Sequence, residues 1–289
     1  MLADILVTGL VNGGVYALLA IGFSLIFGVA RIVNIAHTAF YMLAAYCFYT
    51  LLVKFGLGFL VSGVASVVGV TLLSLVCYRL VIEPVREHEA AVLISTIALG
   101  LIFQELMLYS FGGNYLGIPS TLEGAVRIAG VSIPYQRMLI LVVAALMLFG
   151  VWFLLYRTRL GLAIRSTAND LEVASLMGMN VRRVAMATVA ISVALAAVAG
   201  VVVAPVFVVD PFMWLAPLVT MLAIVVLGGL GSLKGSLIGA LIIGYVEAIT
   251  VFALPGGAYL KGAVALLIMV IVLLARPEGL FGVVFEEER

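Results

Sequence analysis

The chain consists of long apolar segments separated by short polar intervals. Most segments are close to 20 residues long, which is the length that an α-helix needs to cross a bilayer core of about 30 Å. The strict alternation of apolar and polar residues that is typical of membrane β-barrel strands does not occur in them. The pattern therefore predicts an all-α, polytopic membrane protein with about eight to ten transmembrane helices. We place nine segments, at 5–29, 35–53, 57–82, 91–111, 138–156, 184–209, 214–231, 235–254 and 258–275.

Composition supports this class. Hydrophobic residues make up 65% of the chain, charged residues only 10%, and the mean hydropathy is +1.34, whereas about a quarter of the residues in a soluble protein are charged. No interval is long enough for a soluble domain, so we treat 1–289 as a single transmembrane domain. The 30 glycines fit helices that pack closely through small residues. Two of the shorter segments are candidates for re-entrant helices, which would change the number of crossings.

Basic residues predict the orientation. If all nine segments cross, eleven basic residues share one side of the membrane and four the other, and the richer side is expected to be cytoplasmic. This places the N-terminus outside and the C-terminus inside, and it places the interval 157–183 in the cytoplasm. A basic region before the first segment is absent, so we expect that segment to be retained rather than cleaved as a signal peptide. The inner set is Arg31, Arg79, Arg86, Arg157, Arg159, Arg165, Arg182, Arg183, Lys234, Arg276 and Arg289, and the outer set is Lys54, Arg127, Arg137 and Lys261.

The interval 157–183, RTRLGLAIRSTANDLEVASLMGMNVRR, is the longest polar stretch with helical signals. Asn169 is the predicted N-cap of a short helix over about 170–177, Glu172 completes a capping box, and Gly178 follows as the C′ residue. Two turns of helix are marginal alone in water, so a contact must stabilise them. The interval is either a docking element or an ordinary loop with an incidental helix.

The interval 112–137 is the longest on the opposite side, and its Gly, Pro and Ser content argues against a long helix. Its VRIAGVSI pattern predicts a short β-hairpin with a turn near Ala129 and Gly130. The hairpin would cap the external face. It is either a contact surface for an external partner or a solvated connector.

Two glycine-containing stretches interrupt the apolar pattern, FGVARIVNIAHT at 27–38 and LGGLGSLKGS at 227–236. Each follows a segment that runs inward and precedes one that runs outward, so they are candidates for equivalent parts of a duplicated architecture. In transporters, such interruptions often border the substrate path. The alternative is a glycine-rich turn between two ordinary helices.

Polar residues inside the apolar segments form the candidate translocation path. An ionisable group in a membrane helix costs roughly 2.5–3.5 kcal/mol, so each one needs a reason. Each acidic residue either faces a polar cavity or packs within the bundle. His37 is predicted near the inner boundary, as a local hydrogen-bonding residue. The candidates are Asn12, Asn34, His37, Thr38, Glu105 and Glu247.

No enzymatic pattern emerges from the sequence. It contains no GxxxxGK[ST], HExxH or GxSxG motif, and the run GGLGSLKGS lacks the adjacent Lys and Ser of a phosphate loop. A ladder of arginines and a TVGYG filter are also missing, which argues against voltage-gated and potassium channels. We therefore expect a non-catalytic chain with no metal site, no cofactor of its own and no role in nucleic-acid binding.

Four blocks, in order, resemble the LivH-type permease family, the membrane subunits of ABC importers for branched-chain amino acids. They are LVNGGVYALLAIGFSLIFGVARIVNIAHTAFYMLAAY, RTRLGLAIRSTANDLEVASLMGMNVRRV, VVLGGLGSLKGSLIGALIIGYVE and ARPEGLFG. They spread over nearly the whole chain, so the resemblance is specific. The family usually has glycine after the histidine of the first block, where this chain has Thr38, a small departure close to the expected translocation path.

The resemblance implies a complex of two similar or identical permease subunits, two cytoplasmic ATPases that use ATP, and an external substrate-binding protein, in the cytoplasmic (inner) membrane of a bacterium or archaeon. It implies that the interval 157–183 carries a coupling helix that docks on the ATPase. This chain would form half of a translocation path. The matching residues for ATPase coupling lie between 161 and 180, and we single out Gly161, Arg165, Asn169, Asp170, Glu172, Ala174, Gly178 and Asn180.

Branched-chain or other hydrophobic amino acids are the expected ligands. Related importers also carry urea, amides or other amino acids, because the external binding protein imposes much of the selectivity. A different class of protein is an ion-coupled, stand-alone carrier in which Glu105 or Glu247 binds the ion. A membrane scaffold without transport is a third alternative, but it gives the glycine-broken segments no role.

Overall fold

The computed structural model describes residues 1–119, 124–128 and 131–281, and most of them are helical. Each of the nine predicted segments contains one apolar helix, which confirms the all-α, polytopic class. Seven helices are long and apolar enough to cross a membrane, whereas α2 and α9 are shorter. The nine are α1 (Leu2–Ala30), α2 (His37–Tyr49), α3 (Phe59–Cys77), α4 (Glu89–Phe111), α5 (Tyr135–Arg157), α8 (Val181–Val203), α9 (Leu215–Gly228), α10 (Leu233–Ala253) and α11 (Gly257–Ala275).

Some helices continue or end differently from the predicted segments. A π-helical turn, η1 (Thr50–Lys54), extends α2, and α3 continues through η2 (Tyr78–Ile82) and η3 (Glu83–Val85). The sixth segment was predicted to reach 209, but α8 ends at Val203, because Pro205 has no N–H group with which to continue the helical hydrogen bonds. The chain then forms an irregular stretch, which a two-residue bridge between Leu116 and Val209 ties to the loop after α4.

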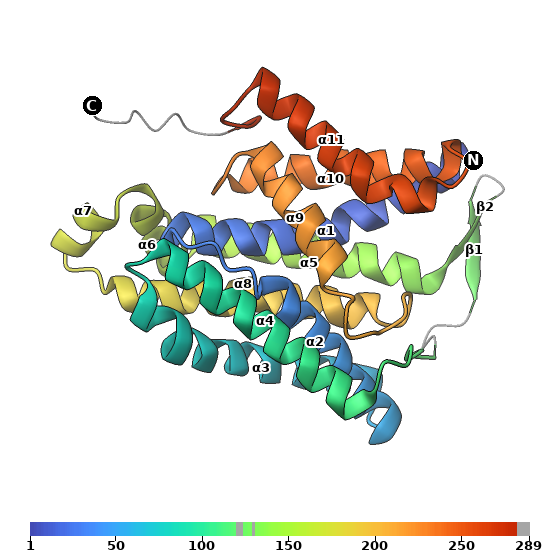
Figure 1. Ribbon diagram of the computed structural model, residues 1–289, viewed down its shortest axis with the longest axis horizontal. Coiled ribbons are helices and arrows are strands. Elements are labelled where there is room, and N and C mark those ends of the chain that lie inside the picture. The colour runs from blue at the N-terminus through green and yellow to red at the C-terminus, as the bar shows by residue number, and fades with distance from the viewer. Residues whose placement is uncertain (120–123, 129–130, 282–289) are drawn as a thin grey trace.

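Most of the long helices lie roughly along the longest axis of the molecule, whereas the shorter α9 is steeply inclined to it (Figure 1). At one end are α6 (Arg159–Asn169) and α7 (Leu171–Leu176), and at the other are the N-terminus and the strands β1 (Ala125–Ile128) and β2 (Val131–Pro134). The two strands pair antiparallel, with Ile128 opposite Val131, so the predicted hairpin is confirmed. The predicted turn residues, Ala129 and Gly130, lie outside the described residues.

Helix α1 occupies the centre of the bundle and packs antiparallel against α10. A Cβ atom on Gly244 of α10 would lie only 2.5 Å from the backbone nitrogen of Gly13 on α1 and 2.7 Å from the carbonyl oxygen of Gly9. The two backbones therefore approach as closely as glycine permits, which is the packing expected of small residues in membrane helices. Nearer the other end of this helix pair, the hydroxyls of Ser24 and Ser236 share a 2.6 Å hydrogen bond.

The two glycine-containing stretches lie together at the end that carries α6. A Cβ atom on Gly28 would lie 3.8 Å from the carbonyl oxygen of Gly231. The last described residues pack against the same region. The backbone N–H groups of Leu280 and Phe281 donate hydrogen bonds of 2.8 and 3.0 Å to the carbonyls of Leu227 and Gly228. These bonds satisfy carbonyls at the end of α9 that have no partner within the helix.

Candidate functional site

A cavity of about 600 Å³ lies among α1, α9, α10, α11 and the irregular stretch after α8. We call it the outer cavity, because its residues lie in the half of the bundle that is nearer the N-terminus and the hairpin. Most of its wall is apolar, and a few polar and charged side chains face it, which is the usual make-up of a small-molecule site. It is lined by Asn12, Val15, Tyr16, Tyr41, Val203, Phe207, Val208, Asp210, Met213, Ala216, Pro217, Val219, Thr220, Glu247, Lys261, Gly262 and Leu266.

Glu247 lies at the base of the outer cavity and is only 1% exposed. Its Oε2 atom accepts a 2.7 Å hydrogen bond from the hydroxyl of Tyr16 on α1. A buried carboxyl group is costly without such a partner. The bond therefore fixes the position of Glu247, and it also links the two central helices at the level of the cavity.

Three charged side chains face the outer cavity. Besides Glu247 they are Asp210, in the stretch after α8, and Lys261, in the first turns of α11. The carboxylate of Asp210 accepts a 2.9 Å hydrogen bond from the backbone N–H of Phe212. Among the described residues, Lys261 forms no ion pair within 4 Å of either carboxylate. The site therefore keeps opposite charges apart along an otherwise apolar wall.

Of the six residues predicted to line the path, the structure brings Asn12 and Glu247 into the outer cavity. Tyr16, Asp210, Thr220 and Lys261 also line the cavity and were not predicted. For Tyr16 a signal was present, because it lies four residues after Asn12 and so on the same face of the helix. No local pattern marked the other three, which reach the cavity through the tertiary arrangement.

The remaining predicted path residues lie elsewhere. Asn34, His37 and Thr38 are buried at the start of α2, away from the outer cavity. His37 was predicted near the inner boundary, but it packs against Gly22, eight residues before the end of α1 and thus about 12 Å deeper. Its Nδ1 atom lies 3.5 Å from the hydroxyl of Ser192. Glu105 is on an exposed face of α4, next to Gln104.

The 157–183 interval begins with a sharp reversal from α5 into α6. The hydroxyl of Thr158 donates a 2.7 Å hydrogen bond to the carbonyl of Leu154 and accepts a 3.0 Å bond from the N–H of Gly161, so it ends one helix and caps the next. A Cβ atom on Gly161 would collide with the backbone of Leu154 and Leu155. Glycine is thus required where α6 folds back on α5. The guanidinium of Arg165 lies 4.9 Å from the ring centre of Tyr156, in a cation–π arrangement.

The predicted short helix is present as α7, but its N-cap was predicted one residue too early. Asn169 is the last residue of α6, and Asp170 is the cap, because its carboxylate accepts a 2.9 Å bond from the N–H of Val173. The predicted capping box of Asn169 and Glu172 is therefore wrong. The C-terminal prediction is confirmed, because Gly178 has a φ of +80° and its N–H bonds the carbonyl of Ser175 at 3.0 Å, as in a Schellman motif.

Helix α7 projects from the end of the molecule (Figure 1) and carries an apolar surface. We call this apolar surface the α7 surface. An apolar patch at a polar end of a membrane protein is unfavourable in water, and such patches mark contact sites. The α7 surface comprises Leu171, Val173, Leu176 and Met177, which are 39%, 51%, 86% and 78% exposed.

Two of the residues predicted for ATPase coupling, Glu172 and Ala174, lie in α7 itself. Ala174 is 2% exposed and packs under α7, whereas Glu172 is exposed in its first turn. Asn180 caps α8 by accepting a 3.0 Å bond from the N–H of Arg183. The exposed apolar side chains themselves were missed, because an apolar residue in a short loop carries no sign that it faces solvent.

Comparisons with known proteins agree with the geometry. The sequence profile of the family described as "Branched-chain amino acid transport system / permease component" matches residues 5–273. The chain is 33% identical to the high-affinity branched-chain amino acid transport system permease protein BraD of Pseudomonas aeruginosa, with 96% of this chain and 94% of that protein covered. It is 30% identical to the corresponding permease protein LivH of Escherichia coli, with 95% and 93% covered.

A solved structure shares the fold at low sequence identity. It is described as "PsaBC from Streptococcus pneumoniae in complex with Fab", and it matches with a TM-score of 0.54 and 15% identity. The match covers 95% of this chain and 92% of that one. This chain and the solved structure therefore share their helical arrangement over nearly the whole length of both.

Proposed function

Since the chain belongs to the branched-chain amino acid transport permease family, and is thus a non-catalytic, multi-pass membrane subunit of an importer, we propose that it carries branched-chain or other hydrophobic amino acids when driven by ATP hydrolysis on partner chains. It forms half of the translocation path, together with a second permease subunit. An external binding protein delivers the ligand, and two cytoplasmic ATPases supply the power stroke. The outer cavity, with its three charged side chains on a mostly apolar wall, is the observation that carries this proposal.

In this proposal the N-terminus and the hairpin face outward, and α6 and α7 face the cytoplasm. The bias of basic residues supports this orientation. The hairpin then caps the face on which a binding protein would dock. The outer cavity opens on the side from which an imported ligand arrives.

The α7 surface is the proposed contact with the ATPase. Leu176 and Met177 would insert into a groove of that partner, which removes their apolar side chains from water. Thr158 and Gly161 hold α6 firmly against α5, and Asn180 starts α8 directly after the loop. Movement of α7 would therefore displace two membrane helices as rigid bodies, which is how nucleotide-driven closure would reach the path.

The outer cavity offers complementary groups to an amino acid. The carboxylates of Asp210 and Glu247 suit an α-ammonium group, Lys261 suits an α-carboxylate, and valines, Phe207 and Leu266 suit an apolar side chain. When a zwitterionic ligand bridges these separated charges, its interactions with them would replace the hydration that it loses on entry. The related substrates, urea and amides, have no net charges to match, so this arrangement favours amino acids.

The test is uptake into proteoliposomes that contain the chain with its second permease and ATPases, supplied with the binding protein. We expect accumulation of leucine, isoleucine or valine that requires ATP and stops when the ATPase is inactivated. If only urea or amides were taken up, they would be the ligands in place of the proposed amino acids. Uptake by this chain alone, driven by an ion gradient without ATP, would instead favour an ion-coupled carrier.

A further inference from the structure

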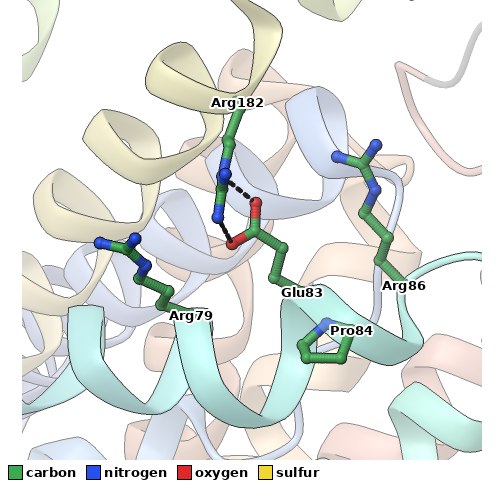
Figure 2. A pocket seen from close by; sticks show the side chains of 5 residues that line it. All are labelled: Arg79, Glu83, Pro84, Arg86 and Arg182. Atoms are coloured by element: carbon green, nitrogen blue, oxygen red, sulfur yellow. Dashed lines mark hydrogen bonds and ion pairs between the residues drawn. The ribbon is translucent and has the colours of Figure 1, made fainter.

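A second cavity, of about 410 Å³, lies at the opposite end of the bundle from the outer cavity. Figure 2 shows the five residues that line it, and three of them are arginines. Arg79 lies in η2, Arg86 directly follows η3, and Arg182 comes from the first turn of α8. We call it the arginine pocket. Its remaining lining residues are Glu83 and Pro84.

Both carboxylate oxygens of Glu83 bind one of the three arginines, Arg182. Its Oε1 atom lies 2.5 Å from Nε of Arg182 and its Oε2 atom 2.8 Å from Nη2, which is a two-pronged ion pair. Arg79 and Arg86 flank this pair on either side (Figure 2). Neither has an ion-pair partner within 4 Å among the described residues. One carboxylate thus lies among three guanidinium groups, of which only that of Arg182 points at it (Figure 2), and no ion pair within 4 Å engages the other two among the described residues.

The other charged groups nearby do not balance the pocket. Glu87 follows Arg86 in the sequence and lines a neighbouring cavity together with it, but no ion pair within 4 Å joins the two among the described residues. Glu89 is exposed at the start of α4. The arginine pocket is therefore a place where an external anion would gain charge-assisted hydrogen bonds from guanidinium groups.

An exposed apolar stripe leads directly to the arginine pocket. Leu72, Val76 and Leu80 follow one another at four-residue intervals along α3 and its extension and are 58%, 53% and 69% exposed. They share one helix face. Arg79 lies three residues after Val76 and seven after Leu72, and so on their side of the helix; the pocket therefore lies where an exposed apolar face meets a cluster of positive charge.

We propose that the arginine pocket binds the phosphodiester headgroup of an anionic phospholipid of the inner leaflet, with an acyl chain along the stripe of Leu72, Val76 and Leu80. The proposal takes only the orientation from the proposed function. Arg79 and Arg86 hold the phosphate, and Arg182 stays paired with Glu83. Basic pockets between transmembrane helices on the cytoplasmic side are suited to such headgroups. The bound lipid would lie beside the base of α8, close to the loop that carries α7.

The experiment is native mass spectrometry of the full-length permease in detergent, titrated with phosphatidylglycerol or with phosphatidylcholine of the same acyl chains. We expect the wild-type chain to retain phosphatidylglycerol preferentially. The double variant Arg79→Gln/Arg86→Gln should bind it roughly 25-fold more weakly, since each basic residue near an anionic lipid contributes about 5-fold. The double variant with lysines at both positions should keep most of the preference, because it keeps both charges.

Arg276→Gln is the matched control, because it removes an exposed arginine on the same side that does not line the pocket. It should leave lipid retention unchanged, and an unchanged unfolding temperature without lipid shows that each variant is folded.

Equal retention of the two lipids would overturn the proposal. Displacement of phosphatidylglycerol by equimolar glycerol phosphate would mean a free-phosphate site instead. Variants that lose ATPase association but keep lipid selectivity would assign the arginines to a protein contact.

Discussion

The hydroxyl of Tyr16 donates a 2.7 Å hydrogen bond to Oε2 of Glu247, and so joins two helices across 231 positions of the chain. The pair lies at the base of the outer cavity, in the half of α1 that is nearer the N-terminus. In the other half, Ser24 bonds Ser236, and His37 packs on Gly22. The polar contacts along α1 therefore change from a pair that lines a cavity, in the half nearer the N-terminus, to groups buried within the bundle in the other half.

The first prediction concerns Glu247. Glu247→Gln keeps a hydrogen-bond acceptor for Tyr16 but removes the negative charge that we assign to the ligand's ammonium group. We expect ATP-driven uptake to fall by about tenfold or more, because a hydrogen bond to a charged group is worth about 1.5–3 kcal/mol. The measurement is initial uptake of labelled leucine into proteoliposomes, at several concentrations.

Tyr16→Phe provides the comparison for this variant. It removes the donor but leaves the carboxyl group in place, so we expect a lower unfolding temperature together with a smaller effect on uptake. If Glu247→Gln transported as well as the wild type while Tyr16→Phe did not, the carboxyl would have a structural role only.

The second prediction concerns Gly178, whose φ of +80° ends α7. Gly178→Val places a β-branched residue in a left-handed conformation, at a cost of about 1–2 kcal/mol, and should unfold the Schellman motif. We expect ATP-dependent uptake to fall several-fold while the permease still purifies as a folded protein. Gly178→Asn is the control, since asparagine tolerates this conformation, and it should keep most of the uptake. If the two variants were equally active, the conformation at the end of α7 would not be needed for coupling.

The third prediction concerns the ion pair of Arg182 and Glu83, which ties the start of α8 to the connector between α3 and α4. Glu83→Arg places two like charges together and should reduce the number of substrate molecules imported per ATP hydrolysed. The exchanged variant Glu83→Arg/Arg182→Glu restores the pair in reverse and should recover part of that ratio. Uptake and phosphate release, measured in the same vesicles, give the ratio. No recovery in the exchanged variant would mean that the attraction between these side chains does not matter.

The fourth prediction concerns the closest approach of α1 and α10. A Cβ atom on Gly244 would lie 2.5 Å from the nitrogen of Gly13, so Gly244→Ala must push the helices apart and should lower the unfolding temperature by several degrees. Gly150→Ala is the control, because a Cβ atom there meets nothing within 4 Å, and alanine favours a helix over glycine. It should leave the unfolding temperature unchanged or raise it. Equal destabilisation by both would contradict the packing described for Gly244.

The apolar segments were predictable because membrane helices must satisfy their backbone hydrogen bonds internally, so length and hydropathy alone reveal them. The hairpin and the glycine that ends α7 were predictable from local turn chemistry. The end of α8 was missed although Pro205 marks it, since apolar residues continue on both sides of the proline.

The composition of the outer cavity was only partly predictable. Asn12 and Glu247 stood out as polar residues within apolar segments, but Asp210 and Lys261 lie outside the helical centres and reach the cavity only through folding. The cap of α7 shows a different difficulty. Asn169 and Asp170 are adjacent and both are good caps, and the choice between them depends on where α6 ends, which the sequence did not reveal.

The most direct test of the central claim, that α7 docks on the ATPase, is site-specific photo-crosslinking in the membrane. A photoreactive residue at Leu176, which is 86% exposed on the α7 surface, should capture the ATPase. The same residue at Tyr259, which is 93% exposed near the start of α11, should not capture it, because that position lies at the opposite end of the helix bundle. Capture from Leu176 alone is the predicted result, and capture from neither position, or equally from both, would contradict the account.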